Sequence, residues 1–114
     1  MNEINKSYLE IKKSKFYSYL YEVNSEEDIK KIIETIKKDN KKAKHVVYAY
    51  TLNNQERLYN DKEPNGTTIG LLDALKRNNK NNYLIVVVRY FGGILLGSGP
   101  LTRTYSKVSY DLFK

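Results

Sequence analysis

An apolar run followed by a glycine-rich turn constrains the fold of this chain more than any other feature. The run, YLIVVVRY, covers residues 83–90 and predicts a central strand that is buried on both faces. Four glycines within residues 92–99 then interrupt the pattern. Pro100 suits the first turn of a helix, which Ser98 or Gly99 would cap. The sequence therefore predicts a strand, a turn and a helix in direct succession.

Two arginines flank this turn, because Arg89 ends the strand and Arg103 lies in the first turn of the helix. Guanidinium groups beside a helix N-terminus make an anion-binding site. In the structural alternative, the glycines only allow close packing and Arg89 pairs with Asp61 or Glu63. Neither G-x-x-x-x-G-K-S/T nor G-x-G-x-x-G occurs, so no nucleotide-binding motif decides between the two interpretations.

Residues 8–23 predict two strands separated by a turn at residues 12–14. In the second strand, Phe16 and Leu20 share one face. The opposite face carries a ladder of mostly aromatic side chains: Tyr17, Tyr19, Tyr21 and Val23. On an open sheet such a ladder can stack nucleic-acid bases, whereas under a helix it packs as part of the core. The sequence leaves both roles open.

An amphipathic helix is predicted to begin after Ser25, which can cap it together with Asp28 in a capping box. Its buried stripe consists of Ile29, Ile32, Ile33 and Ile36. We expect the helix to end near Asp39 or Asn40. Lysines crowd this end: Lys37, Lys38, Lys41, Lys42 and Lys44. They form either a solvated helix end, which the helix dipole favours, or a patch that binds phosphate.

Residues 45–52 predict a further strand, and residues 53–57 a turn before a short strand at residues 58–60. A second helix should follow the turn at Asn65, with Thr67 or Thr68 as its cap. Its expected buried side carries Ile69, Leu71, Leu72 and Leu75. The last helix, near residues 100–113, should bury Leu101, Tyr105, Val108 and Leu112.

The segment DKEPNGT at residues 61–67 supplies acids that can oppose the arginines. We expect Asp61 and Glu63 to face Arg89 and Arg103 across a cleft at one edge of the sheet. His45, the only histidine, is expected to be a polar residue at a strand end. The candidate binding residues are His45, Asp61, Glu63, Asn65, Thr67, Arg89, Gly92, Gly93, Gly97, Ser98, Gly99 and Arg103. We expect no catalytic residue, no metal site and no cofactor.

Composition narrows the class of protein further. The 114 residues are enough for one domain, and they contain no cysteine, no signal-peptide pattern and no apolar run long enough to cross a bilayer. We therefore expect a cytoplasmic protein without a membrane partner. The formal net charge of +7 favours an acidic partner such as nucleic acid. An AT-rich genome, which enriches Lys, Asn, Ile and Tyr in any protein, is the alternative explanation.

These motifs resemble those of the YigZ/IMPACT family. The matching segments are EIKKSKF at residues 10–16, AKH at 43–45, AY at 49–50, DKEPNGT at 61–67 and VVVRYFGGILLGSGPLTRTY at 86–105. Their order and spacing agree over nearly the whole chain. The chain departs from the family pattern at three places. The family usually has Asp-Asp-Gly at residues 60–62, Gly at position 100, and Val and Ala at positions 102 and 104.

The resemblance implies an α/β (α+β) two-layer sandwich, in which helices cover a mostly antiparallel sheet of four strands. This fold is similar to the second domain of a small-subunit ribosomal protein and to a domain of translocating elongation factors. Longer bacterial members carry a C-terminal ferredoxin-like domain, which we expect to be absent here. Residues 1–114 should therefore form a single domain of the N-terminal type.

The resemblance also implies a role in translation, because eukaryotic relatives compete for an activator of a stress-responsive initiation-factor kinase. We expect a non-enzymatic binding module that contacts RNA, the ribosome or a ribosome-associated protein through the basic glycine-rich turn. Two alternatives remain open. One is a regulatory module that contacts only a translation-regulatory protein. The other is an enzyme that acts on a small phosphorylated ligand.

Overall fold

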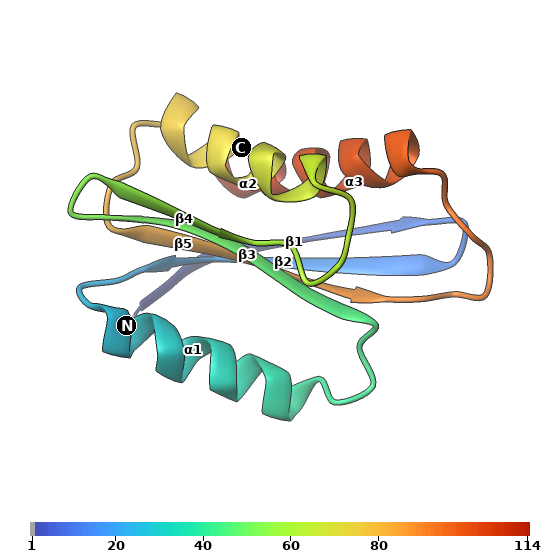
Figure 1. Cartoon of the computed structure of the whole chain (residues 1–114), viewed down its shortest axis with the longest axis horizontal. Helices are drawn as coiled ribbons and strands as arrows, with labels where there is room; N and C mark the ends of the chain where they lie inside the picture. The colour runs from blue at the N-terminus through green and yellow to red at the C-terminus, as the bar shows by residue number, and fades with distance from the viewer. Residues whose placement is uncertain (1) are drawn as a thin grey trace.

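Five strands form one sheet in the computed structural model, which describes residues 2–114 (Figure 1). The strands are β1 (Asn2–Ile11), β2 (Ser14–Glu22), β3 (His45–Leu52), β4 (Gln55–Tyr59) and β5 (Tyr83–Tyr90). They lie in the order β1-β2-β5-β3-β4, and every neighbouring pair is antiparallel. The helices are α1 (Glu26–Asp39), α2 (Gly66–Arg77) and α3 (Ser98–Tyr110), with a short 3-10 helix η1 (Asp111–Phe113). The predicted mixed α/β fold with an antiparallel sheet is confirmed.

The predicted count of four strands is wrong, because β4 pairs with β3 along the edge of the sheet. The predicted turn over residues 53–57 is shorter than expected. Asn53 and Asn54 alone reverse the chain, both with positive φ (52° and 64°), and Gln55 already pairs with Leu52. Two residues of this type make the tightest hairpin connection. The strand predicted at residues 58–60 is β4, which begins three residues earlier than predicted. Residues 55–57 gave no strand signal because they are polar and both faces of this edge strand are exposed.

Helices cover both faces of the sheet, so the molecule has three layers instead of the predicted two (Figure 1). The cause lies in β5, whose side chains alternate between two apolar cores. Val86 and Val88 pack with the isoleucines of α1, whereas Ile85 and Val87 pack with α2 and α3. The prediction that β5 is buried on both faces is confirmed. A strand that is apolar on both faces requires helices on both sides of the sheet.

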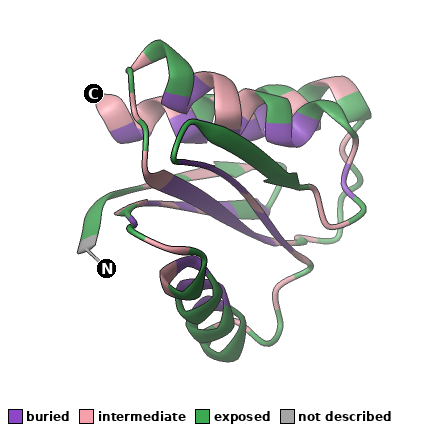
Figure 2. Ribbon diagram, turned by 60° about the vertical axis from the view of Figure 1, so that its left-hand side comes forward, coloured by how far each residue is buried: buried purple, intermediate pink, exposed green. Residues whose placement is uncertain are grey.

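Helix α1 forms as its sequence predicts. The Ser25 side chain accepts a hydrogen bond from the backbone N–H of Asp28, and the Asp28 carboxylate accepts one from the N–H of Asn24. Acidic side chains occupy its first turn and lysines its last, as the helix dipole favours. Its buried residues are the four predicted isoleucines, and Figure 2 shows burial along one side of the helix only.

Three details of the other helices differ from prediction. The predicted threonine cap of α2 is wrong, because Thr67 and Thr68 lie inside the helix and are buried, and Asn65 takes the cap position. Helix α3 begins one or two residues earlier than predicted, with Gly97 at the cap position. Ile69 was expected on the buried side of α2 but is 60% exposed. The four residues predicted to be buried at the chain's end are buried.

Among the described residues, no helix has both the length and the apolar character needed to cross a membrane.

The packing of α2 yields a paired test. Leu71→Ala removes a fully buried side chain and should lower the free energy of unfolding by about 2–5 kcal/mol. Ile69→Ala, two residues earlier, removes an exposed side chain and should change it by less than about 0.5 kcal/mol. Urea unfolding measures both values. Equal losses in the two variants would mean that α2 packs with a different face.

Candidate functional site

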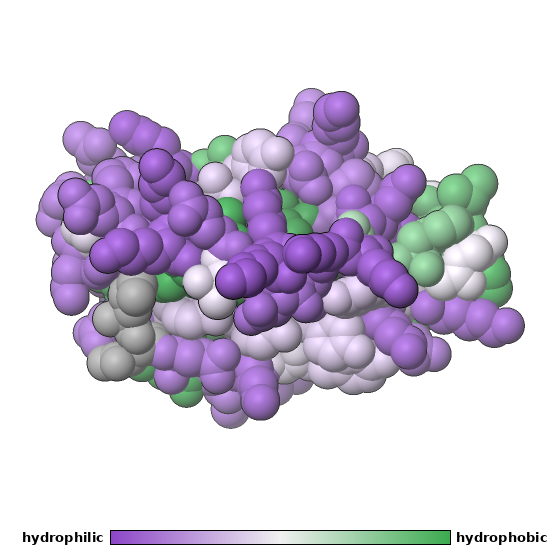
Figure 3. Space-filling model, turned by 90° about the horizontal axis from the view of Figure 1, so that it is seen from below, coloured by the Kyte–Doolittle hydropathy of each residue, from purple (hydrophilic) through white to green (hydrophobic). Residues whose placement is uncertain are grey.

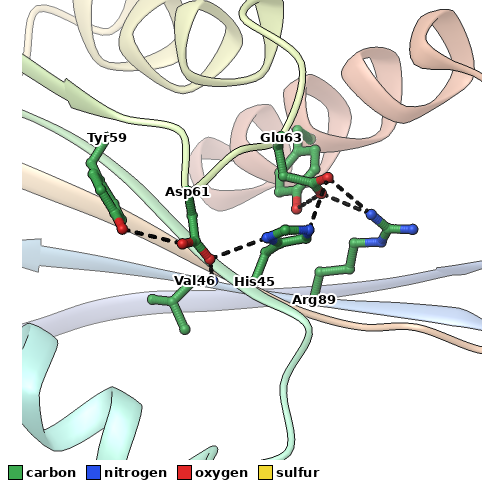
Figure 4. Close-up of polar contacts among 7 residues, drawn as sticks. His45, Val46, Tyr59, Asp61, Glu63 and Arg89 are labelled. Carbon is green, nitrogen blue, oxygen red and sulfur yellow. Dashed lines mark hydrogen bonds and ion pairs between the residues drawn. The ribbon is translucent and has the colours of Figure 1, made fainter.

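Four of the predicted residues meet at the end of the sheet near α3, on the side that α2 and α3 cover (Figure 4). Glu63, in the loop between β4 and α2, lies at the centre. Arg89 donates two hydrogen bonds from Nη1 to its carboxylate, at 3.1 and 2.9 Å. The hydroxyl of Tyr105 on α3 donates to the same carboxylate, and His45 Nε2 lies 3.4 Å from Oε1. The Arg89 and Glu63 side chains are only 7% and 4% exposed.

Asp61 completes the cluster on the other side of the histidine ring (Figure 4). Its Oδ2 atom accepts a hydrogen bond from the backbone N–H of Val46 at 3.0 Å and lies 3.2 Å from His45 Nδ1. Its Oδ1 atom accepts one from the Tyr59 hydroxyl at 3.1 Å. The imidazole ring is therefore held between two carboxylates, and the loop is tied to β3 and β4.

Buried charges in this cluster are compensated by one another. Burial and the neighbouring Glu63 carboxylate raise the pKa of Tyr105, so the phenol stays neutral and serves as a donor. The Arg89 guanidinium lies 5.8 Å from the ring centre of Phe16 and 5.9 Å from that of Phe91. Its charge is thus enclosed by a carboxylate and two aromatic rings. A phosphate group from solvent would have to displace these contacts, which favours the structural alternative for Arg89 and Glu63.

The remaining candidate residues do not join this cluster. Arg103 is exposed on α3 and lines a separate hollow with Leu9, Pro100 and Lys107. Among the described contacts, neither acid is joined to Arg103, so the expected cleft with four facing charges is not formed. Asn65 is exposed and accepts a hydrogen bond from Asn60. Gly97 and Ser98 are exposed at the start of α3.

The glycine-rich turn has a structural role that the sequence left open. A Cβ atom at Gly92 would lie 2.0 Å from the carbonyl oxygen of Lys13, so the turn after β5 crosses the β1–β2 turn at backbone contact. Gly93 has φ 91°, a conformation that side chains rarely allow. In and just before this turn an apolar tip is exposed: Phe91, Ile94 and Leu95, of which Leu95 is 84% exposed. Sequence reasoning missed this tip, although ILL between two glycine pairs is its signal.

The largest hollow lies on the other face of the sheet, the one that α1 covers. It has a volume of about 520 Å³ and is lined by Lys13, Lys15, Tyr17, Tyr19, Asn40, Tyr90, Phe91 and Gly92. Only Gly92 belonged to the predicted set. The signal for the others was the tyrosine ladder of β2, whose exposure the sequence did not determine.

The residues match a family model described as the Impact N-terminal domain, over residues 12–113. The chain belongs to this family. IMPACT family member YvyE of Bacillus subtilis is 38% identical over 101 residues, which make up 85% of this chain and 46% of YvyE. IMPACT family member YigZ of Escherichia coli is 34% identical over 102 residues, 84% of this chain and 50% of YigZ.

Two solved structures share the fold of this Impact N-terminal domain. A crystal structure of a protein described as hypothetical has a TM-score of 0.88 and 30% identity, and the match covers 96% of this chain and 56% of that one. A structure of Yih1, described as a two-domain translational regulator, has a TM-score of 0.50 and 22% identity, and covers 96% and 44%. The chain thus spans about half the length of the bacterial relatives it matches.

The buried ion pair gives a test of the scaffold role. Arg89→Met leaves the Glu63 carboxylate buried without its cation and should lower the free energy of unfolding by about 3–5 kcal/mol. The double variant Glu63→Met with Arg89→Met removes both charges and should lose less than the single variant. Arg103→Met, at an exposed arginine, should cost less than about 0.5 kcal/mol. Urea unfolding distinguishes these outcomes, and equal stability of the two single arginine variants would contradict the scaffold role.

The turn contact can be tested in the same way. Gly92→Ala should destabilise the fold by about 1–3 kcal/mol, because its methyl group would overlap the Lys13 backbone. At Gly97 the same methyl group would lie 3.5 Å from Pro100, an ordinary contact, so Gly97→Ala should cost less than about 1 kcal/mol. Thermal unfolding measures the difference. A tolerated Gly92→Ala would mean that the two turns do not touch.

Proposed function

We propose that this Impact N-terminal domain is a non-enzymatic binding module that contacts RNA in translation or its regulation. The observation that carries the proposal is the composition of the largest hollow, whose lining combines two lysines with three tyrosines and a phenylalanine. Proteins bind nucleic acid without strict sequence preference through this pairing of cations with aromatic rings. The net charge of +7 supports the same class of partner.

Family membership supports the link to translation. Yih1, which shares this fold, is described as a translational regulator. The resemblance to the YigZ/IMPACT family also implies kinship with a ribosomal-protein domain, and this is support by analogy only. We place the module in the cytoplasm, where ribosomes and their regulators are found.

The glycine-rich turn contributes to RNA contact through Arg103, while Arg89 supports the turn from within. Arg103 is exposed and shares its hollow with Lys107, on the next turn of α3, and with Glu10 of β1. The enzymatic alternative required Asp61, Glu63, Arg89 and Arg103 to hold one phosphorylated ligand. The buried Glu63–Arg89 pair gives that alternative no support.

A second candidate function, contact with a translation-regulatory protein, is favoured by one observation. The apolar tip formed by Phe91, Ile94 and Leu95 projects from the loop between β5 and α3. Figure 3 shows hydrophobic surface at one end of the molecule, in contrast to the mostly hydrophilic remainder. Exposed apolar residues that cluster in this way are typical of protein contacts.

Co-sedimentation with purified ribosomes tests the RNA proposal. The protein should pellet with ribosomes at low salt and be released as ionic strength rises. Binding of its lysines and arginines to phosphates releases counterions, and added salt opposes that release. Arg103→Ala should weaken this binding severalfold at unchanged stability. Absence from the ribosome pellet at low salt, or binding that salt does not change, would contradict the proposal. If Leu95→Ser releases the protein and Arg103→Ala does not, protein contact replaces RNA contact.

A further inference from the structure

One face of the sheet is only partly covered. Five strands spaced by about 4.8 Å span about 19 Å between the outer strand axes, whereas one helix is about 10 Å wide. Two helices cover the opposite face, but α1 alone covers this one (Figure 1). Its isoleucines pack mainly on β3 and β5. The half of this face formed by β1 and β2 is therefore the more open one: its β2 tyrosines pack partly against the core under α1 and remain partly exposed.

Tyrosines occupy the open half. Tyr8 on β1 lies opposite Tyr17 on β2, with ring centres 4.9 Å apart, and Tyr17 meets Tyr90 on β5 edge to face at 5.9 Å. Tyr19 lies two residues along β2 on the same face. We call Tyr8, Tyr17, Tyr19 and Tyr90 the tyrosine platform. Figure 3, which looks at this side, shows pale surface of intermediate hydropathy beside the hydrophilic helix.

The platform is hollowed and accessible. The hollow of about 520 Å³ adjoins a second one of about 460 Å³, which is lined by Lys6, Ser7, Tyr8, Tyr17 and Tyr19. The two hollows share Tyr17 and Tyr19, so they lie side by side across β1, β2 and the end of β5, and we refer to them together as the groove. Tyr8 is 48% exposed, and the rings of Tyr17, Tyr19 and Tyr90 are partly exposed.

The charged residues that line the groove are lysines. Its lining includes Lys6, Lys13 and Lys15, and among the described residues no acid lines either hollow. Asn40, which accepts a hydrogen bond from the Tyr90 hydroxyl, belongs to the lysine-rich segment 37–44. Two acids lie on β1 beside the groove. Glu10 accepts a hydrogen bond from Tyr8 and lies opposite Lys15, and Glu3 lies opposite Tyr21.

We propose that the tyrosine platform binds single-stranded RNA by stacking unpaired bases on its rings, an inference that rests on the proposed function and specifies its site. The rings would hold about two or three bases, as an open sheet face does in other RNA-binding modules. The surrounding lysines would neutralise the phosphates of the same strand. A peptide helix is a poorer occupant, because the groove offers tyrosines and lysines where such a helix needs aliphatic contacts.

Fluorescence anisotropy of a labelled oligouridylate of about ten nucleotides tests the platform directly. The variant Tyr8→Leu with Tyr19→Leu removes two rings and keeps apolar bulk, and it should bind roughly ten- to hundredfold more weakly than the wild type. Tyr110→Leu is the matched control. Its hydroxyl also donates to a carboxylate, that of Asp73, but it packs against the opposite core. Its affinity should stay within about twofold of the wild type, and thermal unfolding confirms that all variants fold.

Three further comparisons separate the contribution of charge from that of the bases. Lys15→Glu should weaken binding and lower the salt dependence, whereas Lys114→Glu, the same charge change at the chain end, should alter both much less. An abasic ribose-phosphate chain of equal length should bind at least tenfold more weakly than oligouridylate, because it offers nothing to stack. Duplex RNA, whose bases are paired, should compete poorly.

Failure of this inference and failure of the proposed function give different results. If the wild type binds oligouridylate but the platform variant matches Tyr110→Leu, or if abasic chain binds equally well, RNA contact stands and the platform is not its site. Binding to ribosomes without binding to oligouridylate leads to the same conclusion. If the wild type binds neither, both proposals fall.

Discussion

One helix cannot cover a five-stranded sheet, and the two faces of this domain differ for that reason. The valine-rich strand β5 requires apolar cover on both sides, and it receives two helices on one side and a single helix on the other. The doubly covered face encloses its charged residues. The singly covered face leaves part of its surface open, with tyrosines where a full core would have aliphatic side chains. The unequal cover thus leaves one face closed and the other partly open to solvent.

The charged cluster around Glu63 shows what the closed face does. Its carboxylate joins a loop, the central strand β5 and helix α3 through Arg89 and Tyr105. Removing one partner of a buried ion pair leaves the other charge buried and uncompensated, which strongly destabilises the fold. The pair therefore fixes the geometry of the loop and the turn. Gly92 acts at the same end by allowing backbone contact with Lys13. Of the residues that suggest an anion site in the sequence, Arg89 and Gly92 make contacts within the fold, and Arg103 is exposed on α3.

Structural features that depend on short-range sequence could be predicted, and features that depend on neighbouring elements could not. The Ser25 cap, the isoleucine stripe and the doubly buried β5 follow from short-range chemistry. Strand β4 was predicted too short, with only residues 58–60, because its polar residues 55–57 pair only once β3 offers an edge. The pairing of Glu63 with Arg89 was one of two open alternatives, and only the fold showed that the pair is buried while Arg103 is exposed. The tyrosine ladder was visible, but its exposure depends on which strands α1 covers.

We therefore propose that RNA contacts the open half of the sheet. Arg103 is a separate surface cation, and the apolar loop tip is the alternative contact for a protein. Zero-length ultraviolet crosslinking of the full chain to single-stranded RNA, followed by mass spectrometry of the crosslinked peptides, tests this assignment without any substitution. We expect crosslinks at Tyr8, Tyr17 and Tyr19 on β1 and β2. Crosslinks confined to residues 91–103, or to the outer surface of α2 and α3, would contradict it.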